Sequence, residues 1–328
     1  MNWTTEVEVS KSHIRIDWET DLAFIGSCFA ENMARRFSRF KFHTLENPFG
    51  VVYNPLSLER MLCRVAKENL YLPSEVFFDG ESFHCWDFHG DFSAKTLEVC
   101  LQQMNEAVKK AHHFLQSAKV VFVTLGTARC YFHKESGTVV SNCHRQSADL
   151  FYRELISVEQ TVQALESAVR HLQNLNPQVR IVLTVSPLRH LKDGLHENQI
   201  SKATLLLAVH QIVKRFSNVE YFPSYEIVVD ELRDYRFYAA DMVHLSSVAE
   251  DYIFEKMGAA YFDLTVQQHL PKLNAFLKSA EHRIVDMESA KLRTFAEGAI
   301  LTAKRLESEV RGLDLSAEIH HFESCLKK

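Results

Sequence analysis

The chain has 328 residues, of which 46% are hydrophobic and 24% charged, so it can bury a full core in one large domain or in two unequal ones. The formal net charge of -5 leaves no excess of lysine and arginine to neutralise a phosphate backbone, which argues against a nucleic-acid partner. No stretch approaches the ~18 apolar residues of a membrane span, and seven cysteines without zinc-type spacing suit a reducing compartment, so we expect a cytoplasmic protein without a membrane partner.

The first part of the chain predicts a strand, a tight turn and a helix. The apolar run over residues 22–25 ends at Gly26, and Phe29, Met33 and Phe37 then recur at helical spacing. Further along, the pattern predicts a strand over 41–45, a loop, a helix over 58–65, a hairpin over 76–86 that turns at Asp79-Gly80, and a helix over 97–108.

The middle of the chain alternates between buried strands and amphipathic helices. The continuous apolar runs over 120–125 and 180–185 are typical of strands covered on both faces of a parallel sheet. Helices are predicted over 158–172, 206–216 and 249–257, with another strand over 219–222. This alternation predicts an α/β fold, a three-layer α/β/α structure with a mainly parallel, doubly wound sheet.

From about Leu270 onward the pattern is almost wholly helical. We therefore predict a main domain over residues 1–262, with an inserted hairpin and helix region near 56–115. Residues 263–328 are predicted to form a C-terminal helical extension packed on the main domain.

Ser27 follows the first predicted strand and precedes a helix. Active sites in open α/β sheets form at the carboxyl ends of strands, so polar residues at these positions are the ones to consider. Helix N-terminal N–H groups and the helix dipole stabilise a developing oxyanion there, but the same position equally suits a helix N-cap. The neighbouring Cys28 is a weaker candidate nucleophile, because a side chain one position on points elsewhere.

Asp241 and His244 place a carboxylate and an imidazole three residues apart, after the last predicted strand and before a helix. A serine hydroxyl is a weak nucleophile until a base removes its proton, and an imidazole is the suitable base when a carboxylate fixes its tautomer. Taken alone, the pair also fits a loop cap and a partly buried histidine. Together with Ser27 it predicts a Ser–His–Asp triad.

Several ordered segments resemble one protein family. Gly26-Ser27-Cys28-Phe29-Ala30 looks like the signature of the GSCFA family, a branch of the SGNH (GDSL-like) hydrolase superfamily, and the resemblance covers roughly residues 21–257. The other similar segments are Asn47-Pro48-Phe49-Gly50, Tyr53-Asn54-Pro55, Trp86-Asp87-Phe88-His89, residues 124–128, Asn142-Cys143-His144, residues 186–194, Tyr225-Glu226-Ile227 and residues 234–238.

The resemblance implies a flavodoxin-like sheet, Ser27 as nucleophile, and Asp241 and His244 as the last motif. It also implies that the backbone N–H groups of Ser27 and Gly50 donate to the oxyanion. Where the superfamily has Gly-x-Asn-Asp, this chain has Gly126-Thr127-Ala128-Arg129, so the usual asparagine donor is missing. Thr127 and Asn142 are the replacement candidates, and we favour Thr127 slightly because the strand end fixes its position.

The expected function is a serine esterase of the SGNH type that acts on a small-molecule or carbohydrate ester, with acetyl as the favoured acyl group. This preference comes from the superfamily resemblance. Two alternatives stay open: an O-acyltransferase with the same triad, and a catalytically silent binding module. No cofactor is expected, and no metal, because His112-His113 and His320-His321 are adjacent pairs that project in different directions from a helix.

Overall fold

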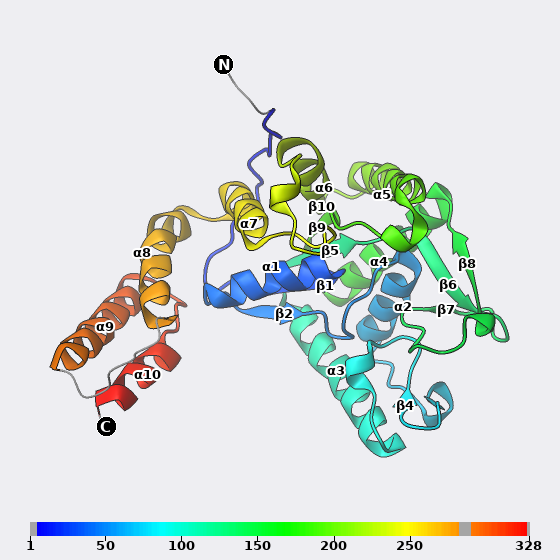
Figure 1. Cartoon of the computed structure of the whole chain (residues 1–328), viewed down its shortest axis with the longest axis horizontal. Coiled ribbons are helices and arrows are strands. Elements are labelled where there is room, and N and C mark those ends of the chain that lie inside the picture. The colour runs from blue at the N-terminus through cyan, green and yellow to red at the C-terminus, as the bar shows by residue number, and fades with distance from the viewer. Residues whose placement is uncertain (1–4, 282–289, 327–328) are drawn as a thin grey trace. The chain divides into compact units, whose positions relative to one another are not determined.

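The structure is a computed structural model that describes residues 5–281 and 290–326. Its contacts divide the chain into two compact units, and Figure 1 labels most of their helices and strands. We call them the main unit (Met1–Val9, Asp21–Arg35, Thr44–Phe254) and the C-terminal unit (Ser10–Thr20, Arg36–His43, Glu255–Lys328).

The main unit is built on a five-stranded sheet in the order β10-β9-β5-β1-β2, with every neighbouring pair parallel. The two strands predicted from continuous apolar runs form with the predicted bounds, because almost all of their side chains are buried. The strands are β1 (Leu22–Gly26), β2 (Thr44–Glu46), β5 (Val120–Leu125), β9 (Arg180–Val185) and β10 (Val219–Tyr221).

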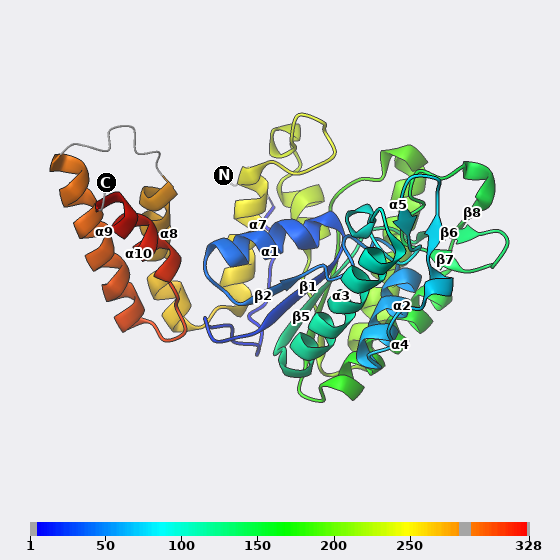
Figure 2. The same cartoon turned by 90° about the horizontal axis from the view of Figure 1, so that it is seen from below.

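Successive side chains of each strand point to opposite faces of the sheet. On one face Ala23, Ile25 and Val121 join a core with four helices, whereas Phe24 and Phe122 stack at 4.8 Å on the other face. The four helices are α2 (Pro55–Ala66), α3 (Leu97–Ser117), α4 (Val158–Leu175) and α5 (Leu195–Arg215). Figure 2 shows α1 (Cys28–Arg39) on the opposite side of the strands from α2, α3 and α4. The predicted three-layer α/β fold is therefore confirmed.

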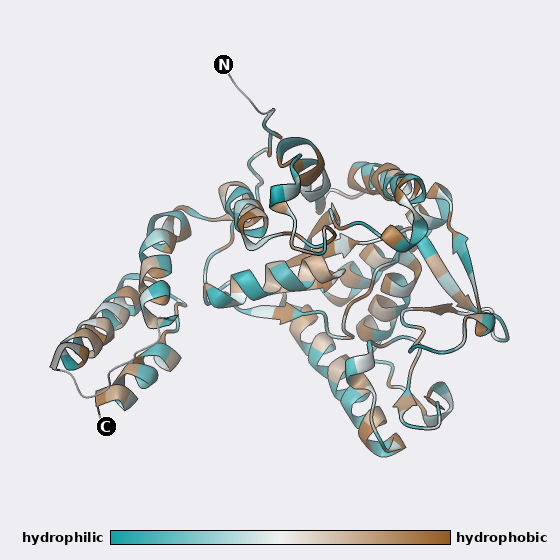
Figure 3. Cartoon of the chain, in the orientation of Figure 1, coloured by the Kyte–Doolittle hydropathy of each residue, from teal (hydrophilic) through white to brown (hydrophobic). Residues whose placement is uncertain are grey.

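The helices are amphipathic and locally capped. Figure 3 shows polar and apolar residues alternating along them, as expected for helices with one buried stripe. At the start of α4, Ser157 accepts from the Gln160 N–H while the Gln160 side chain accepts from the Ser157 N–H, so two helix-end donors are satisfied. Among the described helices, none combines the length and apolar character that a membrane crossing requires.

The strand order creates a switch point between β1 and β5. From β1 the chain runs outward to the edge strand β2 and later returns to β5 on the other side of β1. Connections that leave in opposite directions open a crevice at the carboxyl ends of the two strands, where ligands bind in this type of sheet. Ser27 directly follows β1 and Thr127 follows β5, so both lie at this crevice.

Two smaller sheets complete the strands of the main unit. The predicted hairpin forms from β3 (Phe77–Phe78) and β4 (Phe83–His84), where the Asp79 carboxylate accepts the N–H groups of Glu81 and Ser82 in the turn. An antiparallel sheet that we did not predict has the order β7-β6-β8, with β6 (Arg129–His133), β7 (Val139–Val140) and β8 (Phe151–Leu155). Its strands carry charged side chains and are only half-buried, so they lack the apolar run that predicts a strand.

The C-terminal unit is largely helical, with α8 (Leu264–Glu281), α9 (Ala290–Glu309) and α10 (Ser316–Leu326). The ring of Phe322 lies 6.4 Å from that of Phe276 and 5.8 Å from that of Phe295 and joins the three helices. The predicted helical pattern is confirmed there, whereas residues 282–289 and 327–328 lie outside the described residues. The chain also forms α7 (Ser247–Tyr261), α6 (Ser224–Glu226) and a π-helix over Ile227–Glu231.

Candidate active site

Ser27 lies where β1 ends and α1 begins. Gly26 closes the strand with a φ of 131°, and a Cβ there would lie 2.0 Å from the Thr124 carbonyl oxygen, so only glycine fits. The Ser27 side chain is buried, and its Oγ has no hydrogen-bond partner within residues 5–281 and 290–326. The hydroxyl therefore does not cap α1, which was the alternative interpretation of this position. A buried, unpaired hydroxyl costs about 1–3 kcal/mol, which a functional role would explain.

Asp241 and His244 form a hydrogen-bonded pair in the loop before α7. The Asp241 Oδ2 atom lies 2.6 Å from His244 Nδ1, and its Oδ1 atom accepts the N–H groups of Val243 and His244. These bonds, first among them the side-chain bond to His244, lower the pKa of Asp241 to about 2, so this carboxyl is ionised at neutral pH. With Nδ1 held by the carboxylate, Nε2 of His244 is the ring atom left for proton transfer.

One cavity of about 450 Å³ holds most of the predicted site residues. Ser27, Thr127, Asn142 and His244 line it, and the His244 side chain is half exposed. The Ser27 hydroxyl and the His244 ring share this cavity but are not hydrogen-bonded to each other. Asp241 and Gly50 are not among the lining residues. The structure thus forms the Asp–His pair and leaves Ser27 and His244 in one cavity without a direct hydrogen bond.

The two predicted backbone oxyanion donors are occupied in this structure. The Ser27 N–H donates to the Thr124 carbonyl at 3.1 Å, which continues the pairing of β1 with β5. The Gly50 N–H donates to the Asn47 carbonyl at 2.8 Å, and Gly50 has a φ of 76°. A Cβ at Gly50 would lie 2.2 Å from the Cβ of His89, so close packing also requires glycine here. Neither N–H group reaches an oxyanion unless its present bond is shared or broken.

Thr127 and Asn142 each bring a side-chain donor to the cavity. Thr127 Oγ1 accepts the Arg129 N–H and lies 3.0 Å from the Ser201 hydroxyl oxygen. When Ser201 donates the hydrogen bond between the two hydroxyls, the Thr127 hydroxyl proton is free to point into the cavity. The Asn142 Oδ1 atom accepts the His144 N–H at 2.8 Å, while its amide nitrogen has no partner among the described residues. Both side chains are therefore chemically able to supply the missing donor.

Lys202 is a buried cation next to the site that the sequence analysis missed. Its side chain is 1% exposed, and its Nζ donates to the carbonyls of Gly126 and Ser186, both at 2.6 Å. These two residues directly follow β5 and β9, so Lys202 ties together the ends of two neighbouring strands. Burial lowers the pKa of Lys202 to about 7. The sequence did carry a signal for its burial, because Lys202 recurs at helical spacing with Asn198, Leu205 and Val209 on the buried face of α5.

Replacing Lys202 with methionine is expected to remove a pH dependence of stability. Lysine titrates near 10.5 in an unfolded chain and near 7 here, so between these values the unfolded state binds more protons and stability rises with pH. From pH 7 to pH 9 the free energy of unfolding, measured with urea, should increase by about 2 kcal/mol more in the wild type than in Lys202→Met. Equal increases in the two proteins would show that Lys202 is not a buried, shifted lysine.

His190, Tyr53 and Cys28 also line the cavity. Burial, with a smaller contribution from Lys202, lowers the pKa of His190 to about 4, so its ring is neutral at pH 7. This ring lies edge-on to Tyr53, with centroids 5.5 Å apart, and burial raises the pKa of Tyr53 to about 12. Burial likewise raises the pKa of the Cys28 thiol, which keeps the sulfur protonated and weakens it as a nucleophile.

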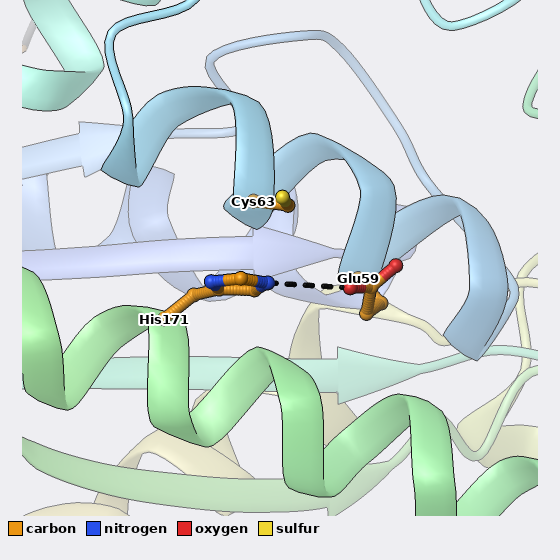
Figure 4. Close-up of side chains that lie close together, drawn as sticks. All are labelled: Glu59, Cys63 and His171. Atoms are coloured by element: carbon orange, nitrogen blue, oxygen red, sulfur yellow. Dashed lines mark hydrogen bonds and ion pairs between the residues drawn. The ribbon is translucent and has the colours of Figure 1, made fainter.

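A group of metal-ligating residue types lies away from the cavity lining. Figure 4 shows Glu59 and Cys63, one turn apart on α2, facing His171 on α4, and their ligand atoms lie within 4.8 Å of one another. Glu59 Oε1 accepts the Ser167 hydroxyl at 2.8 Å and lies 3.3 Å from His171 Nε2. Because these contacts already satisfy the carboxylate and the imidazole, we interpret the group as a contact between α2 and α4.

All residues that line the cavity lie in the part of the chain that matches a known protein family. The model of the GSCFA family matches residues 21–257, a range that contains every residue lining the cavity, whereas no curated protein matches the chain. Among solved structures, a carbohydrate esterase family 3 enzyme from Talaromyces cellulolyticus is 8% identical, with a TM-score of 0.38, covering 79% of this chain and 98% of its own. An acetyl xylan esterase from the rumen bacterium Butyrivibrio proteoclasticus is 13% identical, with a TM-score of 0.37, covering 82% of this chain and 66% of its own.

Proposed function

Because the chain belongs to the GSCFA family, we propose that it is a serine esterase of the SGNH type that hydrolyses an acyl ester, with acetyl as the favoured acyl group. The favoured alcohol part is a carbohydrate or a similar polar molecule. The observation that carries the proposal is the buried Ser27 hydroxyl, which lacks a partner among the described residues and shares its cavity with His244. Asp241, ionised and bonded to His244 Nδ1, completes the set of groups that acyl transfer needs.

In the first half of the reaction, Ser27 Oγ attacks the ester carbonyl carbon. The Ser27 proton passes to His244 Nε2, and the carbonyl π electrons move onto oxygen to give a tetrahedral oxyanion. When this intermediate collapses, the carbon–oxygen bond to the alcohol breaks, and the alcohol leaves with the proton from His244. The product is an acyl-enzyme on Ser27.

Water completes the cycle by the same route. His244 takes a proton from water as the water oxygen attacks the acyl carbon, and Ser27 regains a proton as its bond to the acyl group breaks. Asp241 stays ionised throughout and stabilises the transient imidazolium. The alternative O-acyltransferase replaces water with a second alcohol, so ester formation with added methanol, outpacing acetate release, would favour it.

The position of Ser27 before α1 supports this chemistry electrostatically. Negative charge is stabilised near a helix N-terminus, where the dipole is positive. We propose that substrate binding frees the N–H groups of Ser27 and Gly50 from their present carbonyl partners. Thr127 or Asn142 then adds a third donor. The oxyanion would then have three donors, with Thr127 or Asn142 in place of the asparagine that is missing from this chain.

The experiment that tests the proposal is labelling with a fluorophosphonate, which reacts with activated serine hydroxyls. A single adduct on Ser27 is expected, because His244 can take its proton during the attack on phosphorus. Folded protein in which Ser27 stays unlabelled would contradict the proposal and favour the binding-module alternative.

A further inference from the structure

The cavity is basic although the chain is acidic. Arg129, Arg153, Arg189 and Lys192 line it, and Asp193 is the one carboxylate among the lining residues of the described chain. The whole chain, by contrast, has a formal net charge of -5. A local excess of one sign of charge in a concave site raises the concentration of ligands of the opposite sign.

Two of these cations are neutralised by carboxylates of the same segment of chain. Arg153 forms a two-pronged pair with Asp193, in which Nη2 lies 2.8 Å from Oδ2, and the Asp193 side chain is 1% exposed. Arg129 pairs with Glu197 at the start of α5. These pairs fix the segment over residues 191–197 against β6 and β8, and they leave the other two cations in excess.

Arg189 and Lys192 have no carboxylate partner within the described part of the chain. The Arg189 guanidinium is held in place by aromatic rings, with its central carbon 5.2 Å from the Tyr235 centroid and 4.3 Å from the Tyr238 centroid. One of its nitrogens, Nη1, lies 3.4 Å from the Tyr235 hydroxyl. Arg189 is therefore positioned without being neutralised, and its planar set of donors matches an oxyanion.

Three of the arginines that line the cavity each keep one N–H group that is unpaired within the described chain. The Nε atoms of Arg129, Arg153 and Arg189 are each buried without a hydrogen-bond partner among the described residues. Buried N–H groups in proteins are nearly always paired, and Arg189 combines an unpaired Nε–H with a charge that no carboxylate of the described residues neutralises.

We propose that Arg189 and Lys192 form an oxyanion-binding subsite that selects esters whose alcohol part carries a carboxylate or phosphate group. Arg129 and Arg153, each paired with a carboxylate, hold the segment that carries Lys192 in place. The inference rests on the proposed esterase function for one step: a small acyl group such as acetyl has no charge, so the anion belongs to the alcohol part. Carboxylate and phosphate each present two adjacent oxygens, to which arginine donates two parallel hydrogen bonds.

The test compares matched aryl acetates that differ in charge. 4-Acetoxybenzoate and 4-acetoxyphenyl phosphate are the anionic probes, and 4-acetoxybenzamide is the neutral one. For each protein, kcat/KM for an anionic probe is divided by kcat/KM for the neutral probe. This ratio should be about tenfold or more higher in the wild type than in the Arg189→Met, Lys192→Met double variant. The probe with the larger gain identifies the oxyanion.

A second double variant controls for the loss of two charges. Lys109→Met with Lys110→Met removes two exposed cations from α3, which do not line the cavity, and should keep the wild-type ratio. A ratio that is the same within twofold in the wild type and in the Arg189→Met, Lys192→Met variant would overturn the subsite.

A binding measurement separates failure of the subsite from failure of the esterase proposal. If the wild type hydrolyses none of the probes, the esterase proposal fails. Calorimetric titration with 4-hydroxybenzoate and 4-hydroxybenzamide then still tests the subsite. Tighter binding of the benzoate, lost in Arg189→Met with Lys192→Met, supports the subsite, and equal binding of the two compounds rejects it.

Discussion

Replacing Asp241 with asparagine is expected to lower kcat for 4-nitrophenyl acetate by a factor of up to ~10⁴ while the fold is retained. The carboxylate accepts the Nδ1–H of His244 and so leaves Nε2 unprotonated, which is the tautomer that a base for Ser27 requires. An amide of the same shape favours the wrong tautomer and lacks the charge that stabilises the imidazolium. Half of the Asp241 side chain is exposed, so the substitution should leave the core unchanged.

Asp234→Asn is the matched control for this variant. Asp234 is also an exposed aspartate that caps a turn, since its Oδ1 accepts the Arg236 N–H at 2.9 Å, but it contacts no histidine in the described structure. Its substitution should change kcat less than twofold. Circular dichroism confirms the fold of both variants, and full activity of Asp241→Asn would remove Asp241 from the site.

Loss of the third oxyanion donor is expected to lower kcat by about 10² to 10³, or roughly 2.7–4 kcal/mol, at nearly constant KM. Thr127→Val removes one candidate hydroxyl while keeping the shape of the side chain. Asn142→Asp removes the other candidate, the amide N–H₂ group, while keeping the oxygen that accepts the His144 N–H. The variant whose kcat falls by about 10² or more identifies the donor.

Thr127→Ser separates the hydroxyl from the packing around it. Serine keeps the oxygen that bonds to the Arg129 N–H and to Ser201, so activity should return toward the wild-type value if Thr127 is the donor. If neither Thr127→Val nor Asn142→Asp lowers kcat by even tenfold, the third-donor proposal is wrong and the site works with two backbone donors.

The sheet was predictable from the sequence because its strands are buried on both faces. Residues 120–125 and 180–185 are apolar except at Thr124, Arg180 and Thr184, and they end at Gly126 and at Ser186-Pro187, so both bounds could be assigned before any tertiary information. The three-stranded sheet was not predictable in the same way. Its strands pair across loops and keep one face in contact with solvent, and β6 begins with the charged Arg129.

The candidate site was predictable where its contacts are local. Asp241 and His244 are three residues apart, so one loop makes their hydrogen bond. The occupied N–H groups of Ser27 and Gly50 depend instead on the register of β1 against β5 and on the turn at Asn47, which only the folded chain defines. Lys202 escaped notice because a charged helix residue is usually solvated, although its phase on α5 placed it in the core.

The measurement that tests the central claim most directly is mass spectrometry of the chain after reaction with a fluorophosphonate. We expect one adduct per chain, on the peptide that contains Ser27, absent from Ser27→Ala and retained in Cys28→Ala. Labelling of Asp241→Asn should be slower, because His244 then takes the Ser27 proton less readily. An adduct on Cys28, or no adduct on wild-type protein whose fold is intact, would contradict the assignment of Ser27 as the nucleophile.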